Sequence, residues 1–109
     1  MRYKTNTGTF TQVQGSQSLR APEYFSDLLQ VTIGTEATAG TIAIHAQYAP
    51  TGNWEVVYED DGTTALVIDA TAPKTFQLVD KGVHAIRFTP TGVDAEYHVT
   101  VASAERDKG

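Results

Sequence analysis

The chain contains no cysteine, and it has a single methionine and a single tryptophan. Without cysteine it has no disulfide framework, no thiolate chemistry and no cysteine-based zinc site. It also lacks any apolar run near the ~20 residues of a membrane span. The first residues continue into a polar stretch and not into the apolar core of a signal peptide. These absences predict a protein that is made in a cytoplasm and has no membrane partner.

Positive charge is scarce and unevenly placed. The chain has 8 Lys and Arg against 13 Asp and Glu, which gives a formal net charge of -5. Residues 1–22 carry Arg2, Lys4 and Arg20 and no acid, whereas residues 23–73 carry acids but no Lys or Arg. Three basic residues are too few to hold a phosphate backbone against this acidic body. We therefore expect no nucleic acid partner.

Signatures of catalysis and of metal binding are missing as well. No Gly-x-Ser-x-Gly elbow presents a nucleophile, and no P-loop cradles a phosphate. His45, His84 and His98 lack the spacing of zinc ligands. Residues 59–63 contain Glu and Asp but lack the spacing of a calcium loop. The sequence therefore predicts no catalytic residue, no cofactor and no metal, and we expect that the protein is not an enzyme.

Two segments of the chain share one plan, in which an alternating strand runs into Pro-Thr-Gly and a second strand follows. The first is residues 42–58, with its turn at 50–52, and the second is residues 85–101, with its turn at 90–92. Pro presets its own φ and Gly accepts a positive φ, so Pro-Thr-Gly is typical of a turn. Both segments are therefore predicted to be β-hairpins.

From residue 28 onward, short strands alternate with turns. About seven strands are predicted, at 28–33, 41–48, 54–59, 66–68, 75–79, 85–89 and 96–102. This spacing is typical of an all-β antiparallel sandwich of the jelly-roll or immunoglobulin-like type. The alternation predicts a core formed by Ile42, Ile44, Trp54, Val56, Ile68, Phe76, Leu78, Ile86, Phe88, Tyr97, Val99 and Val101.

The pattern divides the chain into three parts: an extended polar N-terminal arm at 1–27, a β-sandwich domain at 28–103 and a polar tail at 104–109. The arm is rich in Thr, Gln, Ser and Gly and buries little of itself. It is either a loose solvated segment or a strap that docks on an acidic surface, including that of a neighbouring copy. Its expected contacts with a partner are Arg2, Lys4, Phe10, Val13, Arg20, Tyr24 and Phe25.

Three aromatic residues, Tyr48, Trp54 and Tyr58, flank the first turn. Large rings on a thin sandwich usually fill its core. The alternative is a platform on which a sugar ring stacks. Both interpretations stay open at this point, and the second predicts a carbohydrate-binding module.

The middle and end of the chain resemble small structural proteins of tailed bacteriophages. The resemblance covers about residues 40–102. It rests on a Trp-containing strand with an Asp-Gly turn (52–62), a strand at 66–69, a Pro-Lys-Thr-Phe strand (72–78) and an Arg-Phe-Thr-Pro-x-Gly hairpin (85–92). It implies a non-enzymatic β-sandwich protein present in many copies in the virion, which is assembled in the cytoplasm of the bacterial host.

Within that class, the resemblance implies capsid decoration or stabilisation through the N-terminal arm and the sandwich. The expected partners are the major capsid protein or other virion proteins, and a homo-oligomer is expected. A protein of the phage tail or of the head–tail connector is the alternative. A polar arm on a compact body fits either place, because such arms order when they bind a neighbour.

Overall fold

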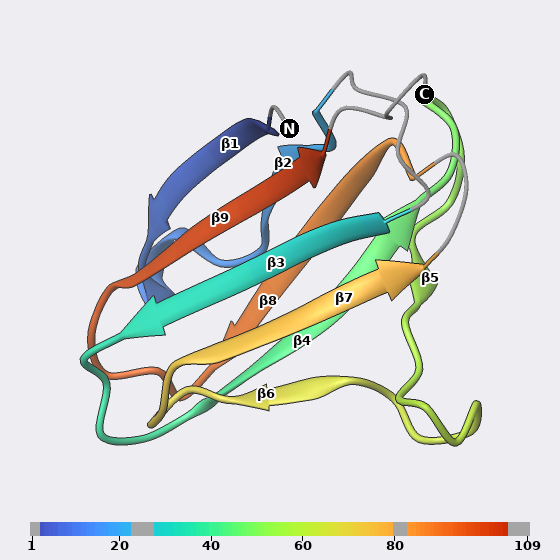
Figure 1. Ribbon diagram of the computed structural model, residues 1–109. Coiled ribbons are helices and arrows are strands. Elements are labelled where there is room, and N and C mark those ends of the chain that lie inside the picture. Colours follow the sequence, from blue (N-terminus) through green and yellow to red (C-terminus); the bar gives the residue numbers. More distant parts are fainter. Residues whose placement is uncertain (1–2, 23–27, 80–82, 105–109) are drawn as a thin grey trace.

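Two antiparallel β-sheets face each other across one apolar core in the computed structural model, which describes residues 3–22, 28–79 and 83–104 (Figure 1). The first sheet has the order β1 (Tyr3–Phe10), β9 (Tyr97–Ala104), β3 (Leu28–Thr35) and β7 (Lys74–Val79). The second has the order β2 (Gln17–Arg20), β8 (Ala85–Thr91), β4 (Thr41–Gln47) and β5 (Glu55–Val56), and β6 (Val67–Asp69) also pairs with β4. The predicted all-β antiparallel sandwich is confirmed.

The core follows from the alternation along the central strands. Ile42, Ile44 and Ala46 of β4 point inward and are buried, and the residues between them face outward. Phe76 and Leu78 of the edge strand β7 are only partly buried. The other predicted core residues that are buried are Ile68, Ile86, Phe88, Tyr97, Val99 and Val101. Val31 and Ile33 of β3 complete the inner face of the first sheet.

The inward face of the strand after the first turn was predicted wrongly. Trp54, Val56 and Tyr58 were expected inside, but Val56 is 42% exposed and Tyr58 is 53% exposed, while Val57 is buried. Val56 lies opposite His45, an outward residue of β4, so the sheet sets Val56 outward too. Because side chains alternate with a period of two, a shift of one residue exchanges the two faces.

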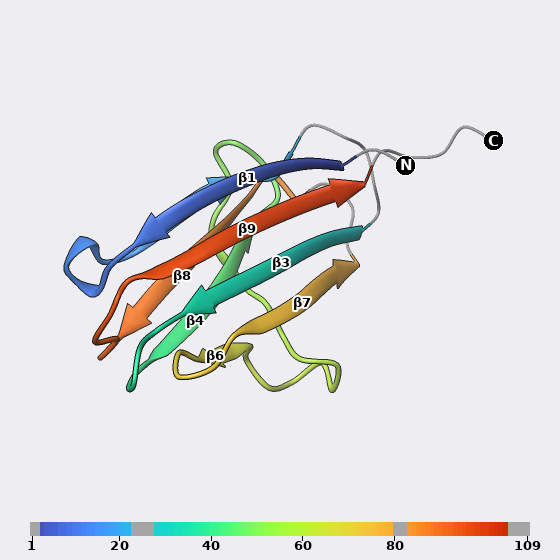
Figure 2. The same ribbon diagram turned by 60° about the vertical axis from the view of Figure 1, so that its left-hand side comes forward.

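Residues 3–10 and 17–20 of the predicted arm are strands of the sandwich and do not form a separate arm. β1 pairs with β9 along its whole length (Figure 2). β2 pairs with β8. The prediction erred because Thr5, Thr7 and Thr9 give no apolar alternation. They face outward, however, and need only the hydrogen bonds that β9 supplies. The expected contacts Arg2, Tyr24 and Phe25 lie outside the described residues, as do residues 105–109 of the tail.

Phe10 enters the core where the two sheets meet, so it is not the partner contact that the arm hypothesis proposed. Its ring centroid lies 6.3 Å from that of Phe88 on β8 and 5.8 Å from that of Tyr97 on β9. Gly8 is required beneath it, because a Cβ there would lie 2.5 Å from Cζ of Phe10. The Phe10 ring therefore binds strands of both sheets together.

The two Pro-Thr-Gly segments differ in structure. The first forms the predicted turn, in which Gly52 N–H donates to Ala49 O at 2.9 Å. In the second, Pro90 and Thr91 belong to β8 and Pro90 is buried, so the turn begins only at Gly92, which has φ 66°. This turn packs on the β3–β4 connection, where a Cβ on Gly40 would lie 2.6 Å from the Val93 backbone.

The position of Phe10 predicts a large loss of stability on truncation. Phe10→Ala should lower the free energy of unfolding by about 3–5 kcal/mol, since it removes a buried ring and leaves a cavity. Urea unfolding followed by circular dichroism measures this change. Val13→Ala, three residues away at a side chain that is 96% exposed, is the matched control and should change stability little. Equal stability of the two variants would contradict the placement of β1 in the sandwich.

Candidate interaction surfaces

The connection between β1 and β2 forms a rigid tip with an apolar side chain at its end. It contains the short 3-10 helix η1 (Gln12–Gln14). Gln12 Nε2 donates to Pro90 O at 3.1 Å, and Gln12 Oε1 accepts from Val93 N–H at 3.0 Å. Thr11 N–H donates to Gln14 Oε1 at 2.7 Å. These bonds fix the tip on the sandwich while Val13 stays 96% exposed. The role of Val13 as a contact with a partner therefore stays a prediction.

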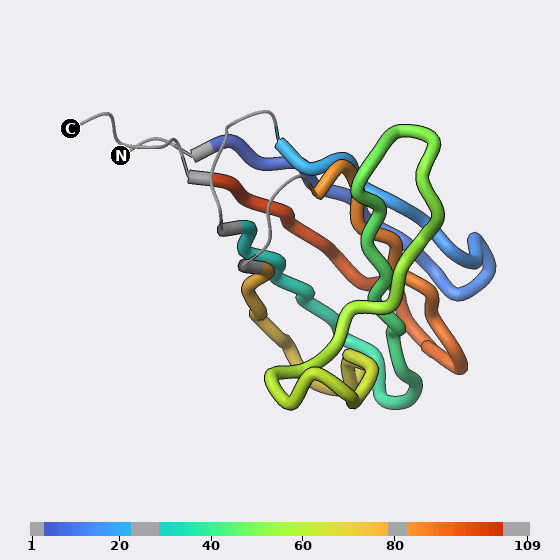
Figure 3. Tube along the Cα trace, turned by 90° about the vertical axis from the view of Figure 1, so that its right-hand side faces the viewer, coloured from blue at the N-terminus to red at the C-terminus, as the bar shows by residue number. Residues whose placement is uncertain are grey.

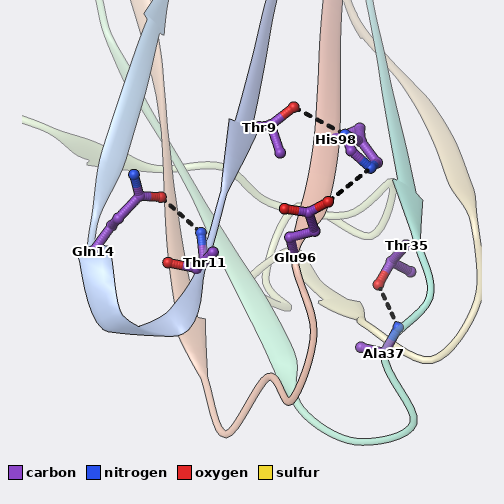
Figure 4. A network of polar contacts seen from close by, with 7 residues as sticks. All are labelled: Thr9, Thr11, Gln14, Thr35, Ala37, Glu96 and His98. Atoms are coloured by element: carbon purple, nitrogen blue, oxygen red, sulfur yellow. Dashed lines mark hydrogen bonds and ion pairs between the residues drawn. The ribbon is translucent and has the colours of Figure 1, made fainter.

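The same end of the first sheet is held by polar side chains (Figure 4). Thr9 Oγ1 lies 2.9 Å from His98 Nδ1, and Nε2 of His98 lies 4.0 Å from Glu96 Oε1. Ala37 N–H donates to Thr35 Oγ1 at 3.0 Å. The ends of β1, β9 and β3 thus present a fixed polar rim.

A row of threonines crosses the outer face of the first sheet. Thr7 of β1 lies opposite Thr100 of β9, which lies opposite Thr32 of β3, and Thr32 lies opposite Thr75 of β7. The Oγ1 atoms of Thr32 and Thr75 are 3.3 Å apart. Such cross-strand pairs stabilise a sheet. The row gives this face uncharged, short side chains across all four strands.

Two of the expected basic contacts, Lys4 and Arg20, lie close together. They line a hollow of about 350 Å³ between β1 and β2. Asn6 Nδ2 donates to Arg20 O at 2.6 Å and joins the two strands there. Both basic residues are exposed, so this edge of the sandwich carries positive charge.

Trp54 lies over a charged side chain on the outer face of the second sheet. Arg87 Cζ is 5.0 Å from the centroid of the Trp54 ring, the geometry of a cation–π contact. His45 is the neighbour of Arg87 across β4 and β8. Burial first, and then the charge of Arg87, lower the pKa of His45. The Arg87 guanidinium therefore occupies one face of the indole.

Residues 58–65 leave the second sheet between β5 and β6 as a small hairpin, here called the finger. Tyr58 pairs with Ala65 at its base, and Glu59 N–H donates to Thr64 O at 2.8 Å. The traces of the finger and of β7 can be followed in Figure 3. A groove of about 720 Å³ lies between them. Its lining residues are Tyr58, Glu59, Asp60, Asp61, Leu66, Lys74, Thr75, Phe76, Gln77 and Leu78. The sequence does not predict this groove, because no local motif connects the finger with β7 and only the fold brings them together.

The three aromatics of the sugar hypothesis have separate surroundings. Trp54 contacts Arg87, Tyr58 lines the groove beside β7, and Tyr48, which is 38% exposed, lies in the turn after β4. Carbohydrate binding at these residues stays a prediction.

Asp61 organises the finger. Its carboxylate accepts from Thr63 N–H at 2.9 Å, from Thr64 N–H at 2.8 Å and from Thr64 Oγ1 at 2.5 Å. The bonds from Thr64, followed by those from Thr63, lower the pKa of Asp61 from 3.8 to about 2. The finger is thus both shaped by a carboxylate and negatively charged at neutral pH.

The hydroxyl group of Tyr97 is buried in the core. Burial raises the pKa of Tyr97 to about 12, so this phenol stays protonated at neutral pH.

Within residues 3–22, 28–79 and 83–104, no three His, Asp or Glu side chains gather in a way that would hold a metal ion. In the same part of the chain no helix is long and apolar enough to cross a membrane.

The fold and these surfaces define an antiparallel β-sandwich with a rigid tip at one edge and a groove at the other. No protein family model and no curated protein matches the chain. Among solved structures it is similar to the prophage-derived protein YomS of SPBc2, with a TM-score of 0.61 and 14% identity over 94% of each chain. This similarity shows a shared fold. The structure of Bacillus endospore appendages, disulfide-linked pili, matches with a TM-score of 0.49 and 12% identity over 96% of this chain and 88% of that one.

The hydrogen bonds of Asp61 predict a specific dependence of stability on pH. Because its pKa is lowered on folding, ionised Asp61 stabilises the protein above pH 3.8, and this contribution is lost as the pH falls to about 2. Asp61→Asn should therefore flatten the rise of unfolding free energy with pH across this window. Urea unfolding at a series of pH values measures the slope. Asp60→Asn, which leaves the Asp61 bonds in place, is the control, and an unchanged slope in Asp61→Asn would contradict the assignment.

Proposed function

We propose that this protein is a non-enzymatic structural protein of a bacteriophage particle, and that it decorates or stabilises the capsid. The observation that carries the proposal is the agreement of two independent likenesses. The residue patterns at 52–62 and 85–92 resemble small virion proteins of tailed phages, and the fold is similar to that of a prophage-derived protein along 94% of both chains.

The tip between β1 and β2 is the proposed surface of attachment to the capsid. A rigid support with one projecting apolar side chain binds with little loss of conformational freedom, because the loop is already ordered. Val13 is the exposed apolar residue there, and Gln12 ties the loop to Pro90 and Val93 beneath it. The major capsid protein is the proposed partner. Within the same class, a place in the tail or at the head–tail connector is the alternative.

The tip predicts that one substitution releases the protein from the particle. Purified protein should co-sediment with particles of the phage that encodes it, produced without this gene. Val13→Asp should lower the affinity for the particle at least tenfold, because a carboxylate that loses its water in an apolar contact without a partner is costly. Val67→Asp, at a valine on β6 that is 50% exposed, is the matched control and should bind as wild type.

Two results would overturn this assignment. If Val13→Asp and Val67→Asp bind equally well, the tip is not the attachment surface. If wild-type protein binds no particle at all, the virion role itself fails. Electron microscopy with gold-labelled antibody then distinguishes the capsid from the tail, because the label lies on the head in the first case and along the tail in the second.

A further inference from the structure

The first sheet ends in two open edges. In its order β1-β9-β3-β7, the strands β1 and β7 each have one neighbour among the described strands (Figure 2). An edge strand directs the backbone N–H and C=O groups of alternate residues away from its sheet. Both edges are therefore able to pair with a further strand, and a strand entering beside β7 has room in the groove of about 720 Å³.

The direction of the strands makes these two edges complementary. Each neighbouring pair in the first sheet is antiparallel, so across four strands β1 and β7 run in opposite directions. A second copy displaced sideways within the plane of the sheet then brings its own β1 antiparallel to β7 of the first copy. The displaced copy continues the pattern that already exists inside the sheet.

We propose that copies of this chain associate head to tail by pairing of β1 of one copy with β7 of the next. The contact is heterologous, since it joins two different edges, and such contacts generate rings or open filaments. This inference does not depend on the proposed attachment to a capsid, because it concerns only contacts between copies and leaves Val13 outside the interface.

The threonine row sets the register of the pairing. If Thr7, Thr100, Thr32 and Thr75 continue as one row, Thr7 of the next copy lies opposite Thr75. Gln77 then lies opposite Thr5 on the same outer face. On the inner face, Lys74 lies opposite Gly8, which has no side chain to oppose its stem. These three facing pairs contain no like-charge pair, and the antiparallel direction keeps Lys4 and Lys74 at opposite ends of the contact.

Charge adds a second layer of complementarity. In each copy β2 lies beside β1, and Asn6 Nδ2 of β1 donates a hydrogen bond to Arg20 O of β2. The same displacement therefore brings the β2 edge of one copy toward the finger of the next. Lys4 and Arg20 line the hollow at the first edge, and Glu59, Asp60 and Asp61 line the groove at the second. Opposite charges at two edges favour this order of copies over edge-to-identical-edge pairing.

Disulfide trapping tests the pairing directly, because the chain has no cysteine of its own. Thr7→Cys and Thr75→Cys variants are prepared separately, mixed and oxidised. Within one chain these positions are three strand spacings apart, about 14 Å, and two cysteines bridge only when their Cα atoms lie within ~7 Å. The expected result is a dimer that joins Thr7→Cys to Thr75→Cys, identified by mass spectrometry, in clear excess over either homodimer. One chain with both substitutions should give a ladder of oligomers.

Thr100→Cys is the matched control, because it lies in the same row in the interior of the sheet and should trap no copy above background. Arg20→Glu should lower the yield about threefold, the change expected from one exposed ion pair, and Asp60→Arg in the partner copy should restore it. Homodimers as abundant as the mixed dimer, or a yield no higher than with Thr100→Cys, would overturn the proposal. Thr5→Cys with Gln77→Cys repeats the test in the same register if the first pair disturbs folding.

Discussion

The contact of the Phe10 ring with both sheets is the interaction on which the rest of the structure depends. Phe10 comes from β1 of the first sheet and packs against Phe88 of the second, with Tyr97 beside it. The ring seats β1 on β9 and closes one side of the sandwich. From there the chain enters the tip, whose bonds through Gln12 rest on Pro90 and Val93. The polar N-terminal segment is thus made part of the fold by its pairing with β9 and β8 and by one aromatic side chain.

The sequence predicts those parts of the fold where burial and alternation coincide. Buried residues alternate along β4, β8 and β9 and are apolar except for Ser103, so the pattern predicts the inner faces of these strands. The strand β1 cannot be predicted from alternation, because its outer residues are threonines and its inner positions end in Gly8 and Phe10. The face of β5 is set by pairing with β4 and not by its own pattern. The groove beside β7 joins segments that no local motif connects.

The gap between the two sheets is closed at the side of β1 and open at the side of β7, although β1 and β7 are both edge strands, and this asymmetry organises the surfaces of the sandwich. At the closed side, Asn6 bonds to the Arg20 backbone and links the sheets, and basic residues line the hollow. At the open side the finger stands away from β7 and carries carboxylates. The described residues therefore form two unlike edges. These edges suit a protein that works by contact with neighbours.

The lone indole of Trp54 gives the molecule a built-in optical label. As the chain's single tryptophan, stacked on Arg87 at the outer face of the second sheet, it reports the polarity of that face alone. A neighbour that lies on this face displaces water from the ring and shifts its emission, whereas one that joins only at the tip leaves the spectrum unchanged. Intrinsic fluorescence thus separates the faces of this sandwich without any dye.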